Sequence, residues 1–283
     1  MEIEQHQQSG PQTRCLERGA DWTLYEHVCE AGPQDRPFEE RHDAFSIATV
    51  LAGTFTYVSE RGRALLHPGA LLLGNHGACY SCGHGHSAGD VCLSAQFKPE
   101  YFAEIAATAA ASSRFRFPAS MLQARRDMLF ETALLEAKRH AHDRLGLEET
   151  LLRFVTIVVR SLSGTVAEAT KVSALDERRV SRAVHHMESH CEDALDLAAL
   201  AGIAAMSKFH FLRVFRRSIG MTPYQFLLGL RLRRAASRLL TTPERVSAVA
   251  FSAGFGDLST FNATFRAWFG MSPSQFRKRG NAP

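Results

Sequence analysis

The stretch FLRVFRRSIGMTPYQF at residues 211–226 returns fifty residues later as FNATFRAWFGMSPSQF at residues 261–276. Eight of the sixteen aligned positions are identical: Phe211 and Phe261, Phe215 and Phe265, Arg216 and Arg266, Gly220 and Gly270, Met221 and Met271, Pro223 and Pro273, Gln225 and Gln275, Phe226 and Phe276. A repeat of this size is one supersecondary unit used twice. In each copy two Phe residues lie four positions apart, on one helical face. A Gly then ends the helix, and a Pro three residues later begins the next one.

Small residues precede each copy of the repeat, where two helices can cross closely over a short turn. Ala204 stands before the first copy and is followed by Ser207, a good helix N-cap. Before the second copy, Gly254 suits a turn between helices and Asp257 can open the next helix. Two helices that meet at a short turn, the second apolar on one side and polar or basic on the other, are typical of the helix-turn-helix DNA-binding unit.

The polar sides of the two second helices supply the candidate DNA contacts. Helical spacing leaves the following residues facing outward: Lys208, Phe209, Leu212, Arg213 and Arg216 in the first helix, and Ser259, Asn262, Ala263 and Arg266 in the second. Arg can bind guanine edges and Asn can bind adenine edges. Arg216 and Arg266 lie further along their helices, so we expect them to hold phosphates. The alternative is an ordinary helical bundle with solvated basic residues, which two copies joined by the basic helix RLRRAASRLL at 231–240 disfavour.

Residues 176–279 resemble the DNA-binding domain of the AraC/XylS family of transcription regulators. The linking helix at 231–240 and the segment VSAVAFSAGFGDLSTFNATFRAWFGMSPSQFR at 246–277 carry the resemblance. It implies a seven-helix domain in which the linking helix places two recognition helices in successive major grooves on one DNA face. Ser259 and Ala263 depart from this pattern, because they are short where long polar side chains could read bases. Activation is the role we expect, and repression stays open.

The charge distribution also separates the chain into two parts. Residues 176–283 carry 16 Lys and Arg against 8 Asp and Glu, whereas residues 1–175 carry 17 against 21. A basic C-terminal part beside a slightly acidic N-terminal part is typical of a nucleic-acid-binding module attached to another domain. The length of 283 residues likewise favours two domains.

The N-terminal part is predicted to form strands first and helices second. From about 44 to 97 short apolar runs alternate with Gly-rich turns: FSIATVLAG, TFTYVSE, RALLHPGALLLG and VCLSAQF. This pattern predicts a β-sandwich or β-barrel. LHPGALLL at 66–73 and His42 resemble part of a cupin-like sensor domain. Helices are then expected at 100–111, 119–142 and 147–163, and the broad apolar face of the last could pack on its own barrel or against a second subunit.

The predicted fold class is therefore α+β and multidomain: a cupin-like β-barrel or sandwich with following helices, and then an all-α domain with two helix-turn-helix units. The expected divisions are a flexible arm at 1–19, a sensor and dimerisation domain at 20–163, a linker at 164–175 and a DNA-binding domain at 176–283.

The segment CYSCGHGHSAGDVC at 79–92 holds three Cys and two His. On a strand, Cys82, His84 and His86 would share one face, and a hairpin turn at 87–90 would bring Cys92 opposite His84. Sulfur and nitrogen ligands in that arrangement suit Zn or another borderline metal. A reduced Cys beside His could instead sense oxidants or electrophiles, and plain packing or pocket lining is a third interpretation.

The sequence carries no Gly-rich phosphate loop, no zinc-protease helix and no nucleophile elbow. The predicted function is a one-component transcription regulator and not an enzyme. The alternative is a cupin-type metal-dependent enzyme with an appended DNA-binding domain, which the lack of a set of His and Glu ligands around His42 disfavours. Expected partners are double-stranded promoter DNA, a small-molecule or redox effector, a second copy of the chain and RNA polymerase. The polar start MEIEQHQQSGPQTR, the absence of an eighteen-residue apolar run and six Cys expected to be reduced predict a cytoplasmic protein without a membrane partner.

Overall fold

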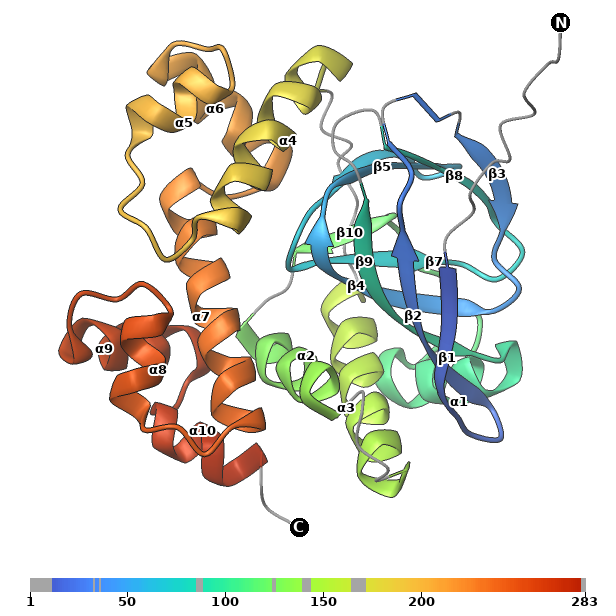
Figure 1. Ribbon diagram of the computed structural model, residues 1–283. Helices are drawn as coiled ribbons and strands as arrows, with labels where there is room; N and C mark the ends of the chain where they lie inside the picture. Colours follow the sequence, from blue (N-terminus) through green and yellow to red (C-terminus); the bar gives the residue numbers. More distant parts are fainter. Residues whose placement is uncertain are drawn as a thin grey trace, which may run out of the picture.

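The computed structural model describes residues 12–280 apart from 33, 36, 85–88, 124–125, 139–143 and 164–171. A β-rich N-terminal half is followed by helices and by an all-helical C-terminal half (Figure 1). The strands are β1 (Gln12–Arg18), β2 (Trp22–Cys29), β3 (Phe38–Arg41), β4 (Phe45–Gly53), β5 (Phe55–Ser59), β6 (Gly62–Leu66), β7 (Ala70–Gly74), β8 (Cys79–Gly83), β9 (Asp90–Phe97) and β10 (Met121–Gln123). The helices are α1 (Pro99–Ala110), α2 (Arg126–Lys138), α3 (Arg144–Leu162), α4 (Ala174–Ser189), α5 (Leu197–Ile203), α6 (Lys208–Ile219), α7 (Pro223–Thr241), α8 (Val246–Ser252), α9 (Leu258–Phe269) and α10 (Pro273–Gly280).

The strands form two sheets. The larger sheet has the order β1-β2-β9-β4-β7-β10, and the smaller has the order β3-β8-β5-β6. Side chains on β9 alternate between the two faces of the larger sheet. Leu93 and Phe97 belong to the core under the helices, whereas Cys92 and Ser94 line the interior on the other face. The larger sheet therefore has one face for a hydrophobic core and one for a pocket.

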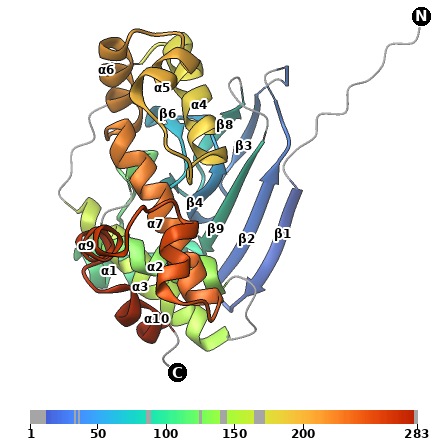
Figure 2. The ribbon, with the colours of Figure 1, turned by 60° about the vertical axis from the view of Figure 1, so that its left-hand side comes forward.

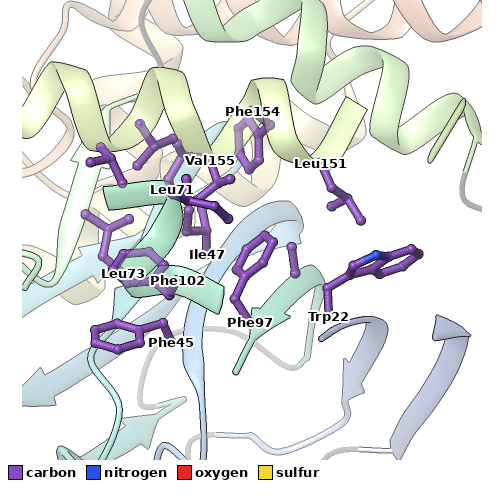
Figure 3. Close-up of a cluster of buried hydrophobic side chains, with 14 of the residues drawn as sticks. Trp22, Phe45, Ile47, Leu71, Leu73, Phe97, Phe102, Leu151, Phe154 and Val155 are labelled. Carbon is purple, nitrogen blue, oxygen red and sulfur yellow. The ribbon is translucent and has the colours of Figure 1, made fainter. Parts of the chain in front are cut away.

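Helix α3 covers the hydrophobic face of the larger sheet. Phe154 and Val155 point from α3 toward Ile47 and Leu71 on the strands (Figure 3). Each of these side chains is at most 1% exposed, and full burial of such a side chain contributes about 1.5–3 kcal/mol. The buried residues of this helix thus pack on the chain's own sheet.

Two sequence predictions in this half are wrong at particular residues. Gln12–Arg18, placed in a flexible arm, is strand β1 and pairs antiparallel with β2. Its mostly exposed side chains give no alternating apolar pattern, which is why the strand was missed. Met121–Gln123, placed in a helix, forms β10 along β7. Three residues at a sheet edge take their conformation from a distant partner, so local periodicity does not reveal them.

The C-terminal half repeats one local design at both ends of α7, with the pair α5 and α6 at one end and the pair α8 and α9 at the other (Figure 1). Ser207 caps α6 by accepting a hydrogen bond from the His210 amide at 3.3 Å, and Asp257 caps α9 by accepting one from Thr260 at 2.7 Å. Gly220 and Gly270 end these helices in the left-handed region, with φ of 82° and 74°. These are the starts and stops that the sequence predicted.

The turns inside the two pairs both contain a left-handed residue. Ala205 follows α5 with a φ of 50°, and Gly254 follows α8 with a φ of 85°. A Cβ atom on Gly254 would lie 2.7 Å from the Cα of Glu192 in the loop after α4. Arg231 of α7 holds the same loop by donating to the carbonyl oxygen of Cys191 at 2.6 Å. The second turn therefore needs glycine both for its conformation and for its approach to the neighbouring loop.

The two halves are packed against each other (Figure 2). Phe130 of α2 shares a core with α7, α9 and α10 and lies 5.0 Å, ring centroid to ring centroid, from Phe276. On the barrel, Arg63 binds Glu177 of α4 with an Nη2–Oε2 distance of 2.5 Å, and the Glu177 side chain is 5% exposed. Gln123 of β10 donates to the carbonyl oxygen of Ile219 at 2.6 Å. Apolar, ionic and hydrogen-bonded contacts thus all join the barrel to the C-terminal helices.

Glu188 of α4 makes one of these contacts and titrates in an unusual range. The amide of Gly53 donates to its Oε1 at 3.1 Å, and its Oε2 is buried without a hydrogen-bond partner among the described residues. Burial raises the pKa of Glu188 to about 7, even though the Gly53 amide, Arg233 and Arg234 act to lower it. Below about pH 7 the folded protein therefore favours the protonated carboxyl.

We expect Glu188→Gln to remove a pH dependence of stability. A folded-state pKa above the ordinary 4.5 contributes stability that is complete below pH 4.5 and is lost as the pH rises through about 7. Relative to the variant, the wild type should therefore lose about 3 kcal/mol of unfolding free energy across that window. Urea unfolding of both proteins between pH 4.5 and 8 measures the difference. Glu192→Gln, which alters an exposed partner of Arg234, is the control, and parallel curves for wild type and Glu188→Gln would contradict the prediction.

Candidate DNA-binding surface and interior pocket

Helix α6 presents a basic face away from its core. Lys208, Arg213 and Arg216 are exposed, while Phe211 and Phe215 are fully buried. Leu212 is half-buried, so it lies at the edge of this face and not at its centre. The Phe209 side chain lies outside what the structure describes.

Helix α9 presents a smaller polar face in the same way. The predicted contacts Ser259, Asn262, Ala263 and Arg266 are all exposed, as are Leu258, Thr260 and Ala267. Phe261 and Phe265 are fully buried, as the repeat predicts, and Thr264 is half-buried. Relative to α6, this helix offers an amide and a methyl group where α6 offers Leu212 and Arg213.

Arg213 is oriented by its neighbour on α6. Its Nη2 donates to Nδ1 of His210 at 3.0 Å, and the Nε2 of His210 lies 3.8 Å from a carboxylate oxygen of Asp176. The hydrogen bond to His210 engages one terminal nitrogen of Arg213 and leaves its other N–H groups available to a base edge. Two parallel hydrogen bonds from Arg to guanine are the commonest specific base contact.

Helix α7 sets the distance between the two helix pairs. Its 19 residues give a length of roughly 28 Å at about 1.5 Å per residue. Recognition elements that read adjacent turns of B-DNA lie about 34 Å apart. The length of α7 is therefore comparable with the separation that would place α6 and α9 along one face of a duplex.

A pocket of about 160 Å³ lies between the two sheets of the N-terminal half. His42 lies in its wall, where Nε2 hydrogen-bonds the hydroxyl of Tyr57 at 2.7 Å and Nδ1 lies 3.3 Å from the Ser46 hydroxyl. Burial lowers the pKa of His42 to about 4, against a smaller opposing effect of Asp43. Tyr80 stacks on His42 and donates its hydroxyl proton to Glu40. The pocket thus has a neutral imidazole and fixed hydroxyl groups as polar features.

The Cys/His segment contributes to this pocket, but not through the predicted hairpin. Strand β8 pairs with β3 and β5, whereas β9 pairs with β2 and β4, so β8 and β9 lie in different sheets. Cys82, His84 and Cys92 nevertheless all line the pocket, because they approach it from opposite sheets. The predicted ligand His86 lies outside the described residues. The local spacing predicted that β8 and β9 form a hairpin, but each of them pairs with strands that are distant in sequence.

Two residues that the sequence did not single out complete the cluster. Cys29, at the end of β2, stands directly opposite Asp90 at the start of β9. Asp90 accepts from His84 with an Nε2–Oδ2 distance of 2.6 Å and from the Cys92 thiol at 3.4 Å. One ligand atom each from Cys29, His84 and Asp90 lies within 4.8 Å of the other two, and all three residues are buried. Cys29 is too far from the segment in sequence for any spacing rule to link them.

Burial changes the ionisation of these groups in opposite directions. It raises the pKa of the Cys92 thiol well above its ordinary value, and nearby Asp90 adds to this effect. For His84 burial acts to lower the pKa, but hydrogen bonds to Asp90 and Cys29 outweigh it and raise the pKa to about 9. A buried thiol with a raised pKa holds its proton, which weakens the interpretation of Cys92 as a reactive thiolate.

Comparison with known proteins shows what the C-terminal half is similar to. A family model described as a helix-turn-helix domain matches residues 200–279. The probable transcriptional regulator LumQ of Photobacterium leiognathi is 29% identical over 156 residues, which are 55% of this chain and 61% of LumQ. The transcriptional activator RhaS of Escherichia fergusonii is 32% identical over 106 residues, 38% of each chain. The C-terminal half of this chain is therefore similar to the DNA-binding halves of AraC-type transcriptional regulators.

Among solved structures, an AraC-type regulator from Chromobacterium violaceum is 27% identical over an alignment that covers 39% of this chain and 99% of the regulator, with a TM-score of 0.37. The chain covers only 61% and 51% of LumQ and of an uncharacterized HTH-type regulator from Haemophilus influenzae. Among the helices that the structure describes, none is long and apolar enough to cross a membrane.

Proposed function

We propose that this chain is a sequence-specific, DNA-binding transcription regulator that responds to an effector bound in its N-terminal half. The exposed residues of α6 and α9 support this proposal. Arg216 and Arg266 occupy the same repeat position, which suits a task common to both helices, such as holding a phosphate. Arg213 and Ala263 occupy another shared position with different side chains, which suits two different base sequences.

The proposed architecture is two helix-turn-helix units, α5–α6 and α8–α9, behind a cupin-like barrel. We propose activation as the role, as in relatives named transcriptional activators. A second copy of the chain and RNA polymerase are the further proposed partners. Since the proposed ligand is promoter DNA, we also propose that the protein acts in the cytoplasm. His42 is engaged by Tyr57 and Ser46, so we assign the pocket to effector binding and not to catalysis.

Arg213→Ala is expected to weaken binding to the preferred site by about 1–3 kcal/mol and to relax preference at one or two base pairs. The physical reason is the loss of paired hydrogen bonds to a base edge. Arg266→Ala should instead weaken binding to every sequence alike, because it removes a phosphate contact, and it should reduce the dependence on salt.

The experiment begins with selection of a preferred site from a random DNA library by the full chain. Affinities of wild type and both variants are then measured on that site and on a scrambled duplex, at two salt concentrations. Arg217→Ala, on the same helix, is the matched control for loss of one positive charge. Equal losses on both duplexes for Arg213→Ala would show that Arg213 does not read bases, and absence of any selected site would overturn the proposed function.

A further inference from the structure

We propose that Cys29, His84 and Asp90 form a binding site for a borderline divalent cation such as Zn²⁺ at one end of the interior pocket. The three side chains offer a thiolate sulfur, an imidazole nitrogen and a carboxylate oxygen, with ligand atoms within 4.8 Å of one another. This donor set matches the preference of Zn²⁺ and its neighbours, and differs from the oxygen-only sets of Mg²⁺ and Ca²⁺.

The spacing of the donors requires only a small adjustment around an ion. Bonds of about 2.0–2.3 Å in tetrahedral geometry separate ligand atoms by roughly 3.3–3.8 Å. His84 and Asp90 stand closer than this, at 2.6 Å, as a hydrogen-bonded pair. A cation would therefore displace two protons to solvent, the one that now lies between His84 and Asp90 and the thiol proton of Cys29.

The burial of all three side chains is more typical of metal ligands than of residues that only fill space. The three residues are 5–8% exposed, and buried charged groups are normally paired or bound to metal. Cys29 and Asp90 face each other across β2 and β9 of the larger sheet, while His84 follows β8 of the smaller one. An ion here would cross-link the two sheets in the wall of the pocket.

The surroundings also resemble a prepared site. Cys92 donates its thiol proton to the second oxygen of Asp90 at 3.4 Å, and such hydrogen bonds commonly orient a ligating carboxylate. With three protein ligands, a tetrahedral ion keeps one position for water or another donor. All three ligands line the pocket, so that position is on the side where an effector would bind.

The test uses the full chain, stripped with a chelator and titrated with Co²⁺. One equivalent of Co²⁺ should produce the intense near-ultraviolet absorption of a sulfur-to-cobalt bond, and Zn²⁺ should displace it. Cys29→Ser should abolish this absorption, and Asp90→Asn should weaken Co²⁺ binding by roughly 100-fold. Circular dichroism establishes that each variant is folded. Failure of folded wild type to bind one equivalent, or absence of the sulfur band, overturns the proposal.

Substitutions of the neighbouring cysteines test which thiol binds the ion. Cys92→Ser should retain the sulfur band and weaken binding by roughly 10-fold, since it acts through Asp90. Cys82→Ser and the exposed Cys79→Ser on the same strand should bind as the wild type does. A band that survives in Cys29→Ser but disappears in Cys82→Ser or Cys92→Ser overturns this ligand set. None of these measurements uses DNA, so they stand or fail independently of the proposed regulatory function.

Discussion

Gly254→Ala is expected to lower the free energy of unfolding by about 3–4 kcal/mol. An L-residue in the left-handed region costs about 1–2 kcal/mol, and Gly254 has a φ of 85°. The new methyl group would also lie 2.7 Å from the Cα of Glu192, a backbone atom that cannot move without displacing the loop held by Arg231. The two effects together place this change among the more destabilising substitutions.

Substitutions at two other glycines test the left-handed conformation and the close approach to Glu192 separately. Gly270 has a similar φ of 74° but open space around its missing Cβ, so Gly270→Ala should cost only about 1 kcal/mol. Gly256 has open space and no left-handed φ, and Gly256→Ala should be close to neutral. Denaturant unfolding of the three variants measures the series. If Gly254→Ala and Gly270→Ala were equally destabilising, the approach to Glu192 would carry no cost.

Arg63→Ala should lower the free energy of unfolding by about 2–4 kcal/mol. Removing Arg63 leaves the Glu177 carboxylate, which is 5% exposed at its side chain, without its counter-ion, although the Thr56 hydroxyl still donates to it. The expected value lies at the low end for such pairs because Arg63 itself is 44% exposed and is partly screened by water. Since this pair joins β6 to α4, its loss should also loosen the packing of the C-terminal helices on the barrel.

The neighbouring Arg61 provides the matched control. Its pair with Glu60 is exposed on both sides, at 42% and 56%, with a distance of 3.7 Å. Arg61→Ala should therefore change stability by less than about 1 kcal/mol. The double variant Arg63→Ala with Glu177→Gln should recover part of the loss, because no buried charge remains. Thermal unfolding of the four proteins measures these differences, and similar losses for Arg61→Ala and Arg63→Ala would show that burial of Glu177 does not matter.

The sequence predicted the C-terminal half in detail because its signals are local. Ser207, Asp257, Gly220 and Gly270 act within a few residues of where they stand, and the same pattern occurs twice. A residue that caps or stops a helix needs no knowledge of distant segments. The exposed faces of α6 and α9 followed from the same helical spacing, apart from Leu212, which is half-buried.

The N-terminal half was predictable only where a strand has its own apolar pattern. FSIATVLAG became β4 as expected, but β1 and β10 carry no such pattern. The interior cluster depended on strand pairing, which brings Cys29 opposite Asp90 although 61 positions separate them. The same applies to Arg63 and Glu177, which are 114 residues apart. Contacts of this kind follow from the folded topology and not from any local spacing.

Helix α7 joins the two helix pairs in tandem, and their exposed side chains differ, because α6 has Arg213 where α9 has Ala263. Under the proposed function, a single bound chain therefore has a polarity. The helix with Arg213 lies toward one end of the site and the helix with Ala263 toward the other. Reversing the site in a promoter would present the opposite side of the protein to its upstream and downstream neighbours, so orientation as well as sequence would determine the regulatory output.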